Sequence, residues 1–206
     1  MTDRAASSDA GGLGAQTGVS IGLANLTADG GDASTAGTFN PNGGGRKNNI
    51  VNSYKKGISI LTDPMTSQIN ILAVPGQRET FITNHAIDKV NNYSMALYLM
   101  DSVKYDAANN RLFDDSAAIV DVGKTSDQMD GRALDSSYTA TFFPDVVIED
   151  PENNRRVKVP SSVAALGVLS YNDKIAHPWF APAGFNRGGL DFVKNVETRL
   201  NTNDKD

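Results

Sequence analysis

The sequence predicts an α/β fold, a layered mixed β-sheet flanked by helices, with α+β character at the edges. From residue 46 onward, stretches with apolar residues at helical spacing alternate with short, nearly continuous apolar runs. The clearest runs, residues 69–74 and 95–100, resemble strands buried on both faces, which favours parallel pairing in the centre of a sheet. A β-hairpin expected at about residues 138–159 adds antiparallel strands, so the sheet is predicted to be mixed.

The first 45 residues differ from the rest and are predicted to form a separate Gly-rich segment. They hold 11 of the 19 glycines and a single aromatic residue, Phe39, so most of this stretch is too poor in apolar residues to pack densely. Apolar residues alternate with small ones in Gly18-Val19-Ser20-Ile21-Gly22-Leu23, which predicts one short strand at about residues 18–24. Residues 46–206 are predicted to form one core domain, truncated at its C-terminal end.

Two helices and two buried strands are predicted between residues 46 and 101. Apolar residues at helical spacing indicate helices over residues 47–61 and 78–91. The runs Ile-Asn-Ile-Leu-Ala-Val and Met-Ala-Leu-Tyr-Leu-Met predict strands at 69–74 and 95–100. Asp63-Pro64 ends the first helix and Pro75-Gly76 ends the first strand, because proline cannot continue either element.

The middle of the chain is more polar. Residues 104–117 are rich in turn formers, and residues 118–122 are predicted as a short strand. Thr125 or Ser126 is the expected cap of a helix that ends near Leu134.

The last third of the chain is predicted to contain the hairpin, a helix and an irregular loop. A strand at 138–143, continued at 146–149, returns after a turn as a strand at 156–159. Ser161 is the expected cap of a helix that runs to about Tyr171. An irregular stretch follows at 177–185. The final amphipathic segment contains Phe192, Val193, Val196 and Leu200.

Composition argues against several classes of protein. The chain has 19 Lys and Arg against 24 Asp and Glu, a formal net charge of −5, whereas nucleic-acid binders usually carry a basic excess. We find no apolar run near the roughly 20 residues that a membrane span needs, and no signal peptide. Cysteine is absent, which excludes disulfides and thiolate chemistry and fits a reducing compartment.

One pattern matches a hydrolase motif. Gly18-Val19-Ser20-Ile21-Gly22 is a G-x-S-x-G sequence, and Asp101 and His177 follow in the order of a catalytic triad. A nucleophile elbow needs a strand before the serine and a helix after it, whereas Ser20 lies inside the alternating pattern itself. We therefore favour a serine within a strand, and keep an α/β ligand-binding domain or serine hydrolase as the alternative function.

Gly43-Gly44-Gly45 resembles an anion-binding loop at the start of a helix. A Walker loop would require Gly-Lys-Ser/Thr after a buried strand, whereas Arg46-Lys47-Asn48 follows here. A turn into the helix is the better interpretation.

The sequence predicts neither a metal site nor a catalytic site. His85 lies on one helical face with Phe81, so a packed histidine is the default. His177 follows Asp173 by four residues, but Pro178 disfavours a helix there, and we find no third ligand. The remaining carboxylates fit turns and helix caps rather than a calcium loop; they are Asp114, Asp115, Asp121, Asp127, Asp130, Asp145, Glu149 and Asp150. We therefore expect no catalytic, cofactor-binding or metal-binding residues.

Trp179, the single tryptophan, lies in a loop flanked by prolines. It fits either a binding hot spot or an anchor that fixes the loop to the core. On these residues alone, we favour the anchor.

Several segments together resemble one family. Residues 138–151 are similar to the aromatic–Pro strand that leads to Asp-Pro in the contractile tail sheath proteins of bacteriophages. The family then shows Val-Pro-Ser, as at residues 159–161, a helix of small residues, and a loop with Trp and Ala-Pro-Ala, as at 179–183. Upstream, residues 69–76 resemble a strand ending in Pro-Gly, and residues 43–45 resemble a double-glycine segment.

The resemblance covers about residues 40–200, with two departures. Family members commonly have two prolines before the helix serine, where this chain has Pro160 alone. The family also continues past this point with a C-terminal domain and an arm, so the chain resembles a fragment.

The resemblance implies a structural role and no enzymatic activity. Sheath subunits stack as hexameric rings around a tail tube and contract to drive the tube through the host envelope. Related sheaths occur in pyocin-like particles and type VI secretion systems. The implied partners are other sheath subunits, the tail tube protein, and baseplate and tail terminator proteins, with neither nucleic acid nor membrane. The implied location is the phage tail of the virion, after assembly in the host cytoplasm. This piece alone is expected to be a monomer.

Overall fold

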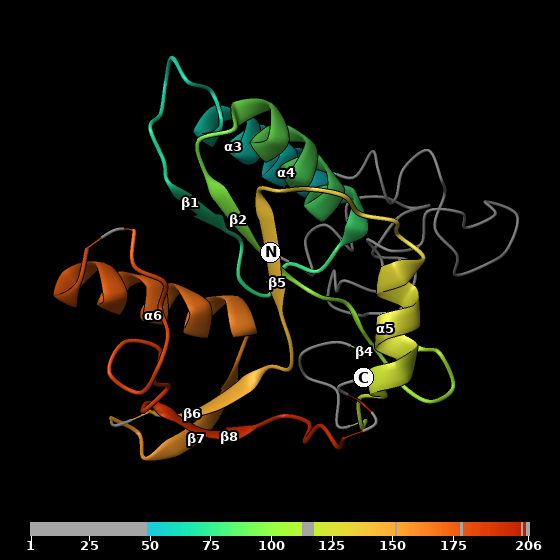
Figure 1. Cartoon of the computed structure of the whole chain (residues 1–206). Helices are drawn as coiled ribbons and strands as arrows, with labels where there is room; N and C mark the ends of the chain where they lie inside the picture. Colours follow the sequence, from blue (N-terminus) through green and yellow to red (C-terminus); the bar gives the residue numbers. More distant parts are fainter. Residues whose placement is uncertain (1–48, 113–117, 151, 178, 203, 205–206) are drawn as a thin grey trace, which may run out of the picture. The chain divides into compact units, whose positions relative to one another are not determined.

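The computed structural model describes residues 49–112, 118–150, 152–177, 179–202 and 204 (Figure 1). These residues divide into two compact units, one containing residues 49–70 and 78–96 and the other residues 71–77 and 97–204. The predicted strand at 18–24, the Ser20 motif and the Gly43-Gly44-Gly45 loop lie outside the described residues. The domain boundary at residue 46 stays a prediction.

The first unit is built on a pair of helices, as the sequence predicts. Helix α3 (Asn49–Leu61) packs against α4 (Thr80–Tyr93) (Figure 1). In α4 the buried residues Ile82, Ala86 and Val90 recur every fourth position, which places them on one face of the helix. Both helices match their predicted ranges to within two residues at each end.

A parallel sheet forms the centre of the second unit, also as predicted. Its strands β1 (Ile71–Ala73), β2 (Leu97–Asp101) and β5 (Thr139–Phe142) lie in the order β1-β2-β5. The middle strand β2 is buried from Tyr98 to Asp101, because sheet partners flank both of its edges and helix α6 (Ser161–Ile175) packs on it. Side chains on both faces of such a strand are apolar, which explains its continuous apolar run.

The predicted hairpin is present, but it belongs to a separate sheet. Strands β6 (Val146–Asp150) and β7 (Arg155–Val159) pair antiparallel, and β8 (Val193–Val196) pairs with the other edge of β6. Residues 138–149 were expected as one interrupted strand. Pro144 lacks the backbone N–H that a ladder needs, and the segments before and after it join different sheets. The α/β class is confirmed, with the strands divided among small sheets.

The middle of the chain departs most from the prediction. Two antiparallel strands of two residues each, β3 (Lys104–Tyr105) and β4 (Arg111–Leu112), form a short hairpin. This hairpin lies within the stretch that was predicted as turns. Residues 118–120 are irregular rather than a strand, and helix α5 (Val122–Asp130) begins directly afterwards.

The cap of α5 is Asp121, not Thr125 or Ser126. The Asp121 carboxylate accepts a hydrogen bond from the backbone N–H of Lys124 at 2.9 Å. Thr125 lies inside the first turn, where its hydroxyl accepts from the backbone N–H of Tyr105 at 3.2 Å and so joins the helix to β3. The helix ends at Asp130, four residues before the predicted end at Leu134.

Helix α6 begins where predicted, but the side chain that caps it comes from strand β2, far away in the sequence. Ser161 is the first helical residue rather than the cap. The buried carboxylate of Asp101, at the end of β2, accepts hydrogen bonds from the backbone N–H and hydroxyl of Ser162 at 3.0 and 2.8 Å. A negative charge at this position also suits the helix dipole. The helix runs to Ile175, beyond the predicted end at Tyr171.

Of the final amphipathic segment, Val193 and Val196 lie in β8, whereas Phe192 and Leu200 lie outside it. Across the described parts of the chain, we find no helix with the length and apolar character that a bilayer crossing requires.

Candidate assembly surface

A cluster of aromatic rings follows α6. The His177 ring stacks on Trp179 with centroids 4.6 Å apart and planes 4° from parallel. The Phe180 ring is nearly perpendicular to both rings, with centroid distances of 5.4 and 6.3 Å. The Arg187 guanidinium lies 5.0 Å from the centre of the Phe180 ring. We call the segment of residues 177–192, apart from Pro178, the aromatic loop.

The aromatic loop has a defined backbone conformation. Asn172, in α6, donates its side-chain N–H to the carbonyl of Phe180 at 2.8 Å, and Gly188 N–H donates to the Gly184 carbonyl at 2.8 Å. A Cβ on Gly188 would lie 2.8 Å from the carbonyl oxygen of Pro182, so this close approach of two backbone segments requires glycine. The loop is thus held by α6 and by its own turn.

Large apolar side chains on and beside the loop are exposed. Trp179 is 76% exposed and Phe185 is 98% exposed. Others in this part of the chain are exposed to a lesser degree: Tyr171, Ile175, Phe180, Leu190 and Phe192. The interpretation of Trp179 as an anchor in the core is therefore wrong for this structure, and its exposure favours the binding interpretation.

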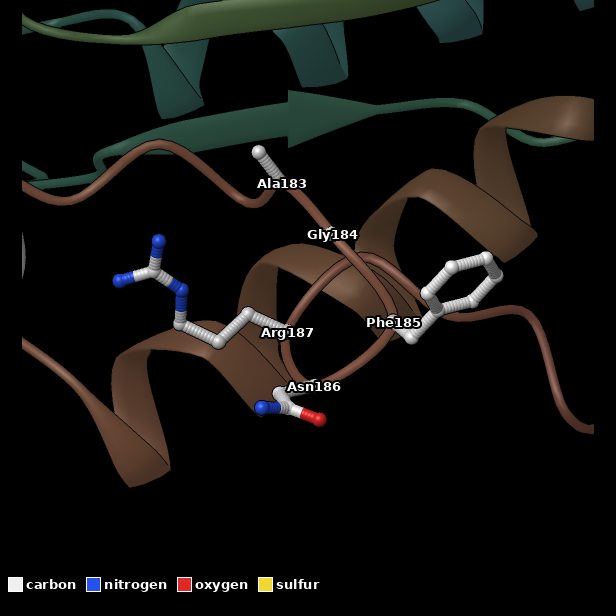
Figure 2. A pocket seen from close by; sticks show the side chains of 5 residues that line it. All are labelled: Ala183, Gly184, Phe185, Asn186 and Arg187. Atoms are coloured by element: carbon white, nitrogen blue, oxygen red, sulfur yellow. The ribbon is translucent and has the colours of Figure 1, made fainter.

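Figure 2 shows the tip of the loop, where residues 183–187 line a shallow open pocket. The Phe185 ring and the Arg187 side chain project from opposite sides of the loop (Figure 2). The tip therefore presents an aromatic ring and a cation in different directions. Trp and Arg are residue types that often dominate binding energy at protein interfaces, and Phe is enriched there.

The histidines hold structural positions. His85, in α4, is half-buried, and its Nε2 lies 3.1 Å from the Ser59 hydroxyl and 3.2 Å from the carbonyl of Lys55, both in α3. His177 stacks on Trp179. Among the described residues, we find no group of three His, Cys, Asp or Glu side chains placed to hold a metal ion.

We expect the stability of the α3–α4 pair to depend on pH through His85. Burial lowers the pKa of His85, and the charges of Lys55 and Lys89 lower it further. The fold therefore favours neutral imidazole, so stability should be full above the ordinary pKa near 6.5 and should fall as the pH drops below it. The melting temperature, measured from pH 7.5 to pH 5, should decrease more in wild type than in His85→Gln. Equal pH profiles would contradict this prediction.

Of the three residues of the suggested catalytic triad, Ser20 lies outside the described residues. The Asp101 carboxylate accepts hydrogen bonds from Gly76, Ser161 and Ser162, which gives it a structural role at the start of α6. The His177 ring stacks on Trp179.

The other carboxylates have mostly structural partners. Asp121 caps α5, and Asp127 and Asp130 lie within it. Asp145 binds Lys104 at 3.0 Å. Asp150 accepts from Asn153 at 2.7 Å in the hairpin turn, which lowers its pKa, and Glu149 lies 3.6 Å from Lys194. Asp114 and Asp115 lie outside the described residues.

Sequence reasoning missed Arg187 and did not single out Phe185. The signal was an aromatic residue and an arginine inside a stretch rich in glycine and proline, a composition that indicates a loop but not which side chains it exposes.

Comparison with curated proteins identifies one relative. The chain is 25% identical, over 180 residues, to the tail sheath protein of Vibrio phage KVP40, and the match covers 80% of this chain. The chain is related to a phage tail sheath protein. This match confirms the resemblance that the sequence motifs indicate. The chain spans about a quarter, 26%, of the length of the sheath relative. No protein-family model matches the chain.

Proposed function

We propose that this chain is part of the structural subunit of a phage contractile tail sheath, with no enzymatic role. In this proposal, subunits stack as hexameric rings around the tail tube and contract to drive the tube through the host envelope. The partners are other sheath subunits, the tail tube protein, and baseplate and tail terminator proteins. The subunit is assembled in the host cytoplasm and resides in the tail of the virion.

The observation that carries the proposal is the similarity to the sheath relative across 80% of the chain. The order of the motifs at residues 69–76, 138–151, 159–161 and 179–183 agrees with it. We propose the same division as above, a Gly-rich segment at 1–45 followed by a sheath-family core domain at 46–206.

The aromatic loop supports a role in assembly. A protein that polymerises must present surfaces that another copy covers, and exposed aromatic side chains supply much of the energy of such contacts. Trp179 and Phe185 are exposed on a loop of defined backbone conformation, so binding would require little ordering of the backbone. We propose that another copy of the subunit covers this loop in the sheath.

Immunogold labelling of the virus particles that encode this protein tests the proposal. Antibodies raised against the chain should label contractile tails along their whole length. Gold confined to the head or to the baseplate, or particles without gold, would contradict the sheath assignment. For the hydrolase alternative, Ser20→Ala should leave esterase assays unchanged at background, and an activity that this variant abolishes would overturn the structural role.

A further inference from the structure

Strand β8 is attached to the second unit through a short ladder with one neighbouring strand, β6. It has four residues and lies at the edge of its sheet beside β6, and the ladder between the two strands is irregular between Val147 and Ile148. Each residue of β8 is at least partly exposed, and Lys194 and Asn195 are the more exposed two. A short edge strand with so little buried surface contributes little attachment of its own.

The attachment is concentrated directly after the strand, at Glu197. Its two carboxylate oxygens accept hydrogen bonds from the Lys104 ammonium at 3.0 and 3.1 Å, and one of them also accepts from Lys158 at 2.7 Å. The Glu197 backbone N–H donates to the carbonyl of Asp145 at 2.9 Å. Lys104 binds the Asp145 carboxylate as well, at 3.0 Å. We call these four residues the Glu197 clamp.

The Glu197 clamp is largely buried, and this burial decides how much the clamp contributes to the attachment of β8. The side chains of Lys104, Asp145 and Glu197 are 1%, 4% and 10% exposed. Charge-assisted hydrogen bonds between buried groups contribute more than an exposed ion pair, which contributes little. The exposed pair Lys194–Glu149, at 3.6 Å, also joins β8 to β6. The clamp therefore contributes more to the attachment of β8 than the exposed pair Lys194–Glu149 does.

The clamp also makes detachment of β8 tolerable for the rest of the unit. When Glu197 leaves, Lys104 keeps the buried carboxylate of Asp145 as its partner. Asp145 in turn keeps the backbone N–H of Ser161, at the start of α6. After β8 detaches, Lys104 and Asp145 therefore still pair with each other, and neither buried charge is left without a partner. An unpaired buried charge would be the main electrostatic cost of detachment.

We propose that β8 and the Glu197 clamp form a latch. Residues 193–202 detach from β6 as one unit while the parallel sheet and α6 stay folded, and Glu197 sets how often this occurs. The latch lets the chain after residue 193 change direction without unfolding the sheet β1-β2-β5. This inference rests on the geometry of the second unit and is independent of the proposed function.

Hydrogen exchange of the full chain, followed by mass spectrometry, tests the latch. In wild type, amides of β8 should exchange through an opening with a smaller free energy than the opening that exposes β2. Glu197→Gln should speed exchange in β8 at least tenfold and leave β2 unchanged, because the neutral amide cannot replace the carboxylate between two lysines. The matched control, Glu149→Gln, removes a carboxylate from the exposed pair and should leave β8 exchange unchanged.

Two results would overturn the latch. Exchange of β8 and β2 through a single common opening in wild type would show that β8 unfolds only with the whole unit. This measurement needs no variant, so it decides the question even if Glu197→Gln fails to fold. An equal effect of Glu149→Gln would show that charge along the ladder, rather than the clamp, holds the strand.

Discussion

Replacement of Asp101 with alanine is expected to lower the free energy of unfolding by about 3–5 kcal/mol. Asp101 is 1% exposed and accepts hydrogen bonds from Gly76, Ser161 and Ser162. Alanine leaves the backbone N–H and hydroxyl of buried Ser162 without this acceptor, although the Ser161 hydroxyl keeps the carbonyl of Phe142. It also removes the negative charge at the start of α6. The loss is large beside a typical domain stability of about 5–15 kcal/mol.

Urea denaturation followed by circular dichroism measures this effect. Asp121→Ala is the matched control, because Asp121 also caps a helix through its carboxylate but at a more exposed position. It should cost only about 1 kcal/mol, as an ordinary helix cap does. If Asp101→Ala costs no more than Asp121→Ala, the buried carboxylate is not the principal support of α6.

The importance of Asp101 illustrates what the sequence does not reveal. The run at residues 95–100 predicted β2 correctly, and helical spacing with Pro160-Ser161 predicted the start of α6. Asp101 itself was considered only as the end of a strand and as a triad member. Its partner Ser162 lies 61 residues further along the chain, and local patterns carry no information on such a pair. Ser161 was therefore wrongly assigned as the cap, since serine is the usual local solution.

The division of the strands among separate sheets could not be predicted for the same reason, because it depends on pairs of residues that lie far apart in the sequence. The pairing of β6 with β7 depends on a local turn and was predicted from it. The pairing of β6 with β8, and of β5 with β2, depends on contacts between distant segments. The Glu197 clamp could not be predicted from the sequence, because Lys104 and Glu197 are 93 positions apart.

The aromatic loop was predictable as a loop but not as a surface. Proline and glycine identified the irregular stretch after α6, and the structure confirms it. From the sequence, Trp179 fitted an anchor or a hot spot, because large aromatic side chains are used in both settings, and the anchor was favoured. Only the exposure of Trp179 and Phe185 distinguishes the two.

The second large effect is expected at Phe185, in assembly rather than in folding. Its side chain is 98% exposed, so Phe185→Ala removes almost no packing within the chain and should leave the melting temperature unchanged. If another copy of the subunit covers the aromatic loop, the same variant removes a ring from the contact. The concentration needed for polymerisation should then rise at least tenfold, in line with the roughly 2 kcal/mol that an interface hot spot contributes.

Sedimentation of the protein that carries this sequence, across a concentration series, measures that threshold. Ile119→Ala is the matched control, because Ile119 is also a large apolar side chain, 85% exposed, but lies outside the aromatic loop. It should leave the threshold unchanged. Polymerisation of Phe185→Ala at the wild-type threshold would exclude the ring from the contact between copies. A lower melting temperature for Phe185→Ala alone would instead show that another part of the same protein covers the loop.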